Sequence, residues 1–129
     1  CVALGGRERD ERIQGGPLHP LLPLLRYIAD HCLQQGEEAA SRIVGRRVGV
    51  LAGYEPQFAS LPGLAGHPEP PPLPPAAARE RLIGDLAETL ARFAREVPTV
   101  MLIDDLQWAD ELTLSFLAGL PASFFADNA

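Results

Sequence analysis

The chain has 129 residues, 47% of them hydrophobic and 22% charged, which suits one modest globular domain with its own core. The formal net charge of −6 offers no basic surface to nucleic-acid phosphates, so we expect this segment not to bind DNA or RNA directly. No apolar run reaches the roughly 20 residues that span a bilayer and no leader peptide is recognisable, so we expect a cytoplasmic location without membrane contact.

Cysteine and histidine usage argues against a metal site. Cys1 and Cys32 are too few for a disulfide framework and have no zinc-binding spacing, which agrees with a reducing compartment. We expect Cys32 to be a small core residue. His19, His31 and His67 lie on different predicted elements and lack a ligand spacing, so no zinc site is expected.

The first third of the chain predicts a strand and a helix. CVALGG (1–6) is a short apolar run ended by glycines, and the charged, glycine-rich RERDERIQGG (7–16) then predicts an exposed loop. In residues 20–34, apolar side chains recur every three or four positions, which predicts a helix with Pro20 or Pro23 in its first turn. Its buried stripe is expected to be Leu21, Leu24, Leu25, Ile28 and Cys32.

The middle of the chain predicts a second helix and a proline-rich linker. Residues 36–54 begin with acids and carry arginines further on, an order that favours a helix, although Gly45 and Gly49 each weaken it by about 1 kcal/mol relative to alanine. Residues 55–75 hold eight of the chain's 13 prolines. We interpret them as an irregular or polyproline-like linker within the domain. PEPPPLPP (68–75) is also suited to docking on an aromatic groove of a partner, although a spacer role is simpler.

The last third predicts a helix, a strand and a helix. Residues 76–97 place apolar side chains on one stripe: Leu82, Leu86, Leu90, Phe93 and Val97. Pro98 ends this helix, and TVMLI (99–103) predicts a strand covered on both faces in a parallel sheet. Asp110 is expected to cap a helix over residues 111–120. The order of elements predicts an α/β architecture.

Two adjacent acids, Asp104 and Asp105, directly follow the predicted strand. Ligands of open α/β sheets bind at the carboxyl ends of the strands, and in P-loop NTPases an acid at this point helps to hold Mg²⁺. We therefore expect Asp104 to bind Mg²⁺, partly through water, and Asp105 to act as the catalytic residue beside the γ-phosphate and the attacking water. An ordinary junction between strand and turn has the same pattern, so the acids alone leave both interpretations open.

The surrounding residues carry a family resemblance. MLIDDLQWAD (101–110), followed by ELTLSFL, resembles the Walker B segment of the STAND group of AAA-like P-loop ATPases. GGPLHPLLPLLRYI (15–28) and residues 73–96 resemble that family's helices after the second strand and before Walker B. The resemblance implies a partial P-loop NTPase fold, three-layer α/β/α with a parallel sheet, truncated at both ends. Residues 1–129 are then an internal fragment of one domain, with residues 98–120 as the Walker B strand and its following helix.

The resemblance also implies a function. It suggests a regulatory ATP-binding and ATP-hydrolysing domain, with Mg²⁺ as cofactor, in a larger bacterial signal-transduction or transcription-regulating protein. Its partners would be ATP and the other domains of that protein, such as a kinase, cyclase or DNA-binding domain. The family's Walker A loop ends in Gly-Lys-Ser/Thr, whereas this chain has 11 arginines and no lysine. Walker A is therefore expected upstream of Cys1. The isolated segment is therefore expected not to hydrolyse ATP. The alternative is a non-catalytic α/β interaction module or an inactive fragment.

Three residues near the acids have plain structural interpretations. We expect Trp108 to be a buried anchor of the turn and Gln107 to occupy a solvated turn position. Asp110 resembles a family signature residue, but its first expected role is to accept hydrogen bonds from amides at the start of the next helix.

Overall fold

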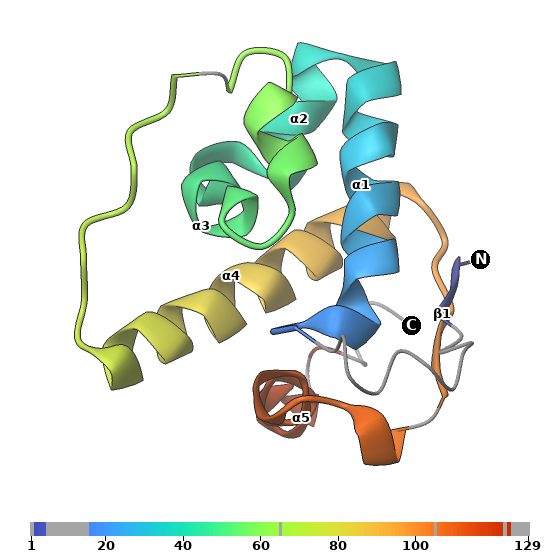
Figure 1. Ribbon diagram of the computed structural model, residues 1–129. Coiled ribbons are helices and arrows are strands. Elements are labelled where there is room, and N and C mark those ends of the chain that lie inside the picture. The colour runs from blue at the N-terminus through green and yellow to red at the C-terminus, as the bar shows by residue number, and fades with distance from the viewer. Residues whose placement is uncertain (1, 5–15, 65, 105, 123, 125–129) are drawn as a thin grey trace.

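The computed structural model describes residues 2–4, 16–64, 66–104, 106–122 and 124 (Figure 1). Most of these residues are helical. Along the chain the α-helices (α), 3₁₀ helices (η) and strands (β) are β1 (Val2–Leu4), η2 (His19–Leu21), α1 (Leu22–Gln35), α2 (Glu37–Ile43), η3 (Gly45–Arg47), α3 (Val48–Ala52), η4 (Pro56–Ser60), α4 (Pro75–Glu96), β2 (Met101–Ile103), η5 (Leu106–Trp108) and α5 (Glu111–Gly119).

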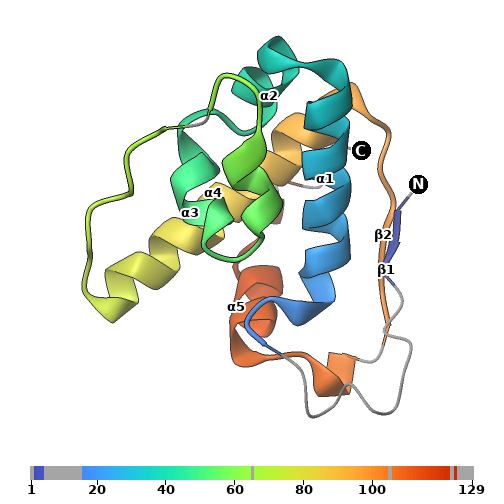
Figure 2. The ribbon, with the colours of Figure 1, turned by 45° about the horizontal axis from the view of Figure 1, so that its top comes forward.

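The predicted three-layer α/β/α fold is wrong for the part of the chain that the structure describes. Strands β1 and β2 pair in parallel, with Val2 opposite Met101 and Leu4 opposite Ile103, and no third described strand joins them. This short pair lies beside α1 at one side of a helical body (Figures 1 and 2). A layered sheet needs several extended apolar runs, whereas the described chain between β1 and β2 has mainly helical apolar periodicity and an exposed proline-rich connection.

Strand β2 is covered on one face only, so the expectation of burial on both faces is also wrong. Met101 and Ile103 are partly buried and pack against the helical core. Leu102 points the other way and is 58% exposed, and Val100 is 55% exposed. Alternate side chains of a strand face opposite sides, so the helices cover one side of β2 and leave its other side open.

Helix α1 confirms the predicted apolar stripe. Leu21, Leu24, Leu25, Ile28 and Cys32 are all buried, and Pro23 lies in the first turn, where its missing N–H has no helical partner to lose. Burial, with a smaller contribution from the negative charge of Glu96, raises the pKa of the Cys32 thiol to about 11. Cys32 is therefore a neutral core residue near pH 7, as expected.

The single helix predicted for residues 36–54 is broken in the structure. Gly45 has φ +51°, a left-handed conformation that glycine adopts at little cost and that ends helix α2 after Ile43. The chain then makes the 3₁₀ turn η3 and continues as α3. Gly45 therefore separates two short helices that can pack at different angles.

Helix α4 is the longest element and supports the rest of the helical body. Its 22 residues correspond to roughly 33 Å, and it contacts α2, α3 and α5 (Figure 1). The predicted stripe is confirmed at Leu82, Leu86, Leu90 and Phe93, which are buried. Within the described chain, every helix is too short or too polar to span a membrane.

A buried arginine links α4 to the preceding helices. The side chain of Arg47 donates from Nε to Thr89 Oγ1 at 3.1 Å and from Nη2 to the carbonyl oxygen of Ile43 at 2.8 Å. Burial, followed by repulsion from Arg92, lowers the pKa of Arg47, although Glu88 and Asp85 oppose the shift. These two hydrogen bonds partly replace the water that Arg47 loses on burial.

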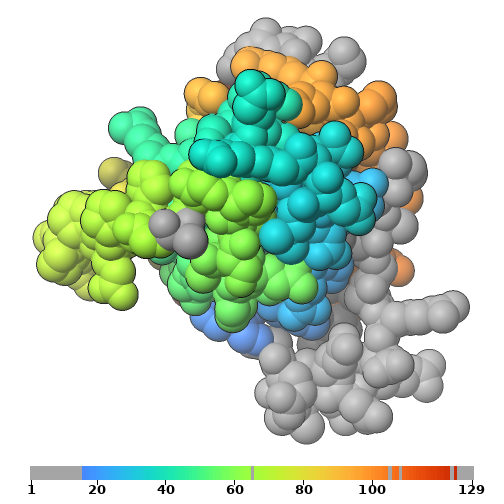
Figure 3. Space-filling view, turned by 90° about the horizontal axis from the view of Figure 1, so that it is seen from above, coloured from blue at the N-terminus to red at the C-terminus, as the bar shows by residue number. Residues whose placement is uncertain are grey.

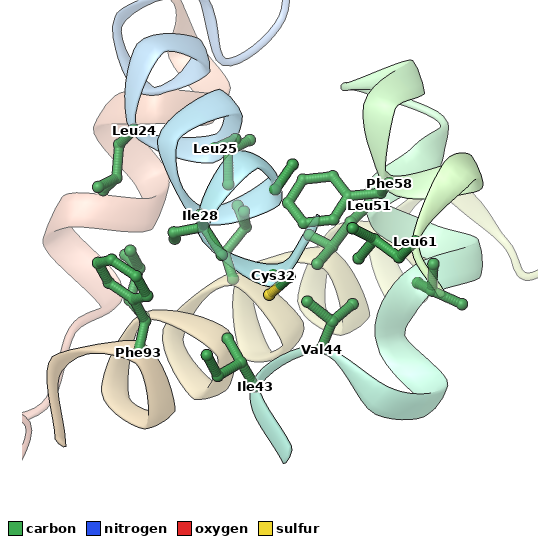
Figure 4. Packing of buried hydrophobic residues seen from close by; sticks show 14 of the residues in the cluster. Leu24, Leu25, Ile28, Cys32, Ile43, Val44, Leu51, Phe58, Leu61 and Phe93 are labelled. Atoms are coloured by element: carbon green, nitrogen blue, oxygen red, sulfur yellow. The ribbon is translucent and has the colours of Figure 1, made fainter. Parts of the chain in front are cut away.

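The hydrophobic core includes the beginning of the proline-rich segment. Figure 4 shows Phe58 and Leu61 packed with side chains of α1 and with Leu51 of α3. Phe58 and Leu61 are fully buried, so this stretch is not the surface connection that its prolines suggested. Further along, residues 67–74 have no regular secondary structure and are mostly exposed, as expected of a linker.

Two helical glycines give a test of the packing. Gly84→Ala in α4 should stabilise the chain by about 1 kcal/mol, because alanine is the better helix former and the added methyl group meets nothing within 4 Å. Gly49→Ala in α3 should gain much less or destabilise, because the new Cβ would lie 2.9 Å from Pro70 Cδ. Urea unfolding of both variants measures the difference. An equal gain would contradict the close packing of Pro70 on α3.

Candidate functional site

The first acid of the doublet lies at the end of the strand pair. Asp104 directly follows Ile103, the last residue of β2, and is exposed. Because β1 and β2 are parallel and Leu4 pairs with Ile103, the chain leaves both strands at the same edge. Asp105, the predicted catalytic residue, lies outside the described residues.

A short turn connects the acids to α5. Residues 106–108 form the 3₁₀ helix η5, and the N–H of Ala109 donates to the carbonyl oxygen of Leu106 at 3.0 Å. Gln107 is exposed, as expected of a turn position. The side chain of Trp108 lies outside the described part of the chain, so its predicted role as a buried anchor stays a prediction.

Asp110 ends this turn and caps α5, which confirms its expected structural role. Its φ of −70° and ψ of 161° are the extended values usual at an N-cap. Oδ2 accepts a hydrogen bond from the Thr113 N–H at 3.1 Å, and Oδ1 accepts one from the buried Thr113 hydroxyl at 2.5 Å. The first turn of α5 is therefore fixed through both carboxylate oxygens.

The same carboxylate also holds a distant part of the chain. Oδ2 of Asp110 accepts a third hydrogen bond, at 3.1 Å, from the N–H of Leu18, which is 92 positions away. Leu18 has φ +62°, a left-handed conformation that costs a residue with a Cβ roughly 1–2 kcal/mol, and its side chain is fully buried. Asp110 therefore joins the start of α5 to the entry of the η2–α1 segment.

These hydrogen bonds set the ionisation of Asp110. Partial burial alone would raise its pKa, but hydrogen bonds from the Thr113 hydroxyl, the Leu18 N–H and the Thr113 N–H outweigh burial and lower the pKa. Asp110 is thus ionised near pH 7, and its charge also lies favourably at the positive end of the α5 dipole.

A shallow depression of about 510 Å³ lies beside Asp110, not around Asp104. Side chains from α4 and from the start of α5 line it together with Pro17 and Tyr54. At its edge, Arg79 Nη2 donates to Ser115 Oγ at 2.7 Å and to Glu111 Oε1 at 3.2 Å, linking α4 to α5. Glu111 is 86% exposed, so this ion pair contributes little on its own.

Two of these contacts could not be found from the sequence. Leucine does not favour a left-handed backbone, so nothing marked Leu18 as a special position. The bond from Arg79 to Ser115 joins separate helices, and no local spacing reveals it. The cap at Asp110 was predictable because an acid directly before a helical apolar pattern is a local signal.

A comparison with known families decides the identity of the chain. Residues 7–124 match the family model described as an AAA ATPase domain. The chain belongs to this family. No curated protein and no solved structure matches it. Membership makes this AAA ATPase domain a nucleotide-binding ATPase-like module, and the match spans Leu18, both acids of the doublet and Asp110.

The three contacts of Asp110 generate a stability prediction for the AAA ATPase domain. Asp110→Ala should destabilise the chain by about 2–4 kcal/mol, the sum of a lost cap and an N–H of Leu18 left without its acceptor. Asp110→Asn should cost about 1 kcal/mol, because an amide oxygen still caps a helix but cannot accept all three bonds. Urea unfolding near pH 7 measures both losses, with the exposed Asp30→Ala of α1 as control. A loss below about 0.5 kcal/mol for Asp110→Ala, as at an ordinary surface site, would contradict the tie.

The lowered pKa of Asp110 generates a pH prediction. A carboxyl whose folded pKa lies below its ordinary value, here 3.8, stabilises the fold above that value and loses this contribution as the pH falls through the folded pKa. The stability difference between the wild type and Asp110→Asn should therefore be full near pH 7 and shrink on acidification below about pH 4. Unfolding free energies measured across this range test it. A difference that stays constant down to about pH 2 would show that the charge of Asp110 is not what matters.

Proposed function

We propose that this AAA ATPase domain is a nucleotide-dependent switch, and that it binds and hydrolyses ATP within a larger cytoplasmic protein of the STAND group that regulates bacterial signalling or transcription. The family match over residues 7–124 carries the proposal, since it supports an ATPase-like module. The segment MLIDDLQWAD supports the finer assignment, because it resembles the Walker B segment of that group.

The position of Asp104 supports a role in holding the metal. Its carboxylate is exposed at the end of β2, where a bound nucleotide could approach it. Carboxylate oxygens are the hard ligands that Mg²⁺ prefers. Among the described residues no three His, Cys, Asp or Glu side chains form a metal cage. Mg²⁺ usually keeps several waters and takes one or two carboxylates together with phosphate oxygens, so a site built on Asp104 fits it.

The two acids would have different roles in ATP hydrolysis. Asp104 would hold Mg²⁺ of the Mg·ATP complex, partly through its water ligands. When bound, Mg²⁺ supplies positive charge to the β- and γ-phosphates. Asp105 would accept a hydrogen bond from the attacking water and orient it. Adjacent residues of an extended chain point in different directions, which allows the pair to serve both tasks.

Asp110 would support this site without touching the nucleotide. It fixes the end of the short turn that follows the acids, through Thr113 on one side and Leu18 on the other. Asp110 thereby fixes the far end of the turn that begins after Asp104. Pre-organised acids lose less conformational freedom when they meet a charged ligand.

The partners of such a switch would be ATP and the other domains of the protein that carries this chain. The phosphate-binding lysine of the family has no counterpart in the 129 residues, which contain arginine as their only strongly basic residue type. ATPase measurements therefore belong to the longer protein that also supplies a phosphate-binding loop.

Asp105→Asn tests the catalytic role in that protein. Losing a residue that orients or deprotonates the attacking water should lower turnover by roughly 100-fold or more, while Mg·ATP binding persists. Steady-state ATPase rates and equilibrium binding of Mg·ATP separate the two effects. The exposed Asp30→Asn of α1 removes the same charge and should leave both unchanged. If the Asp105→Asn variant turns over ATP as fast as the wild type, Asp105 has no catalytic role.

Asp104→Asn tests the metal role separately. Because the amide carries no charge, it should bind Mg²⁺ more weakly than the carboxylate does. Half-maximal nucleotide binding should therefore require a higher Mg²⁺ concentration. Titration of nucleotide binding with Mg²⁺ measures the shift, and thermal unfolding checks that the variant is folded. An unchanged Mg²⁺ dependence would remove Asp104 from the metal site.

A further inference from the structure

The second half of the proline-rich region forms an exposed extended segment, which we call the proline segment and define as residues 68–74. Its residues are exposed except for Pro70, and Leu73 presents 40% of its surface to solvent. Figure 3 shows the yellow-green end of this region projecting from the molecule. Unlike Phe58 and Leu61 before it, the segment contributes nothing to the hydrophobic core.

The conformation of the proline segment suits recognition by another protein. Pro74 has φ −54° and ψ 151°, near the values of polyproline II. Pro68, Pro70, Pro71 and Pro72 have no N–H to donate, and a polyproline II helix needs no internal hydrogen bonds. Pro71 and Pro74 have the PxxP spacing, which places both prolines on one edge of a polyproline II helix because that helix has three residues per turn.

Two contacts hold the middle of the segment against the helical body, and its end leads directly into α4, where the carbonyl oxygen of Pro74 accepts a hydrogen bond from the Ala78 N–H at 2.9 Å. At Gly49 of α3 the absence of a side chain lets Pro70 pass closely, since a Cβ there would lie 2.9 Å from Pro70 Cδ. Arg81 Nη1 of α4 donates to the carbonyl oxygen of Pro71 at 2.8 Å. The backbone is therefore anchored at residues 70, 71 and 74, while the side chains of Leu73 and Pro74 remain exposed. An anchored extended segment loses little conformational entropy on binding.

We propose that the proline segment is a docking site for a partner protein domain whose groove is lined by tyrosine and tryptophan rings. Such grooves bind PxxP segments by packing aromatic rings against the prolines. The exposed Pro71, Leu73 and Pro74 supply the apolar contacts. Proline pairs well with flat aromatic faces because its ring is rigid and already set for the extended backbone.

The negative charge of the segment and of the chain indicates which partner surfaces would be attracted. Glu69 is the acidic residue of the segment and is exposed, and the chain as a whole has a net charge of −6. A groove with arginine or lysine at its rim would therefore be attracted, whereas an acidic rim would be repelled. The partner is accordingly a domain with an aromatic groove and a basic rim. This inference is independent of nucleotide binding, because it uses none of residues 104–110.

The experiment is a calorimetric titration of the whole 129-residue chain with an isolated WW domain that has a tyrosine–tryptophan groove and an arginine at its rim. Saturable binding with one site is expected. Pro71→Ala together with Pro74→Ala should weaken it by about tenfold or more. Leu73→Asp, which keeps every proline, should cause a similar loss. Pro121→Ala, at an exposed proline after α5, is the matched control and should bind as the wild type does.

The docking site and the basic rim are tested by different outcomes. Absence of saturable binding, or equal binding by the wild type and the double proline variant, would overturn the docking site. Glu69→Gln should weaken binding severalfold at low salt and much less at high salt. Equal affinity of Glu69→Gln at low salt would overturn the basic rim. Circular dichroism of each variant shows whether the helices persist, so a loss of binding is not confused with unfolding.

Discussion

The carboxylate of Asp110 ties together two parts of the chain that are distant in sequence and that also pack in the same hydrophobic core, where Leu18 and Phe116 are buried. It accepts hydrogen bonds from Thr113 in the first turn of α5 and from Leu18, before α1. The Leu18 backbone is left-handed and its side chain is buried, so this entry is strained and needs support. One ionised group thus stabilises the start of α5 and offsets part of the strain at Leu18.

This connection helps to position the turn that follows Asp104 relative to the helical body. The strands β1 and β2 are short, and only one face of β2 packs on the helices, so the pair alone holds the following turn weakly. The turn is fixed at its far end by Asp110, and α5 is in turn held to α4 by Arg79 and Ser115. Asp110 and Arg79 thus link the start of α5 to the entry of α1 and to α4.

Local patterns in the sequence predicted the helices better than the architecture. The stripes of α1 and α4 and the cap of α5 follow from residue spacing, and the structure confirms them. The break at Gly45 was missed because a glycine in a helical pattern does not reveal whether its φ is positive. The layered sheet was implied by the family resemblance, whereas only two described strands pair. The apolar residues 99–103 predicted a strand covered on both faces, but Val100 and Leu102 face solvent. Of the site, the cap at Asp110 was predictable, whereas its bond to Leu18 depends on the tertiary fold.

Amide hydrogen exchange at Leu18 tests the central role of Asp110 most directly, because that N–H donates to its carboxylate. In the wild type the Leu18 amide should exchange slowly, and Asp110→Ala should accelerate exchange at Leu18 and Thr113 far more than at Ile28 in the middle of α1. Fast exchange at Leu18 in the wild type, or rates unaffected by the substitution, would show that Asp110 does not hold these two segments together.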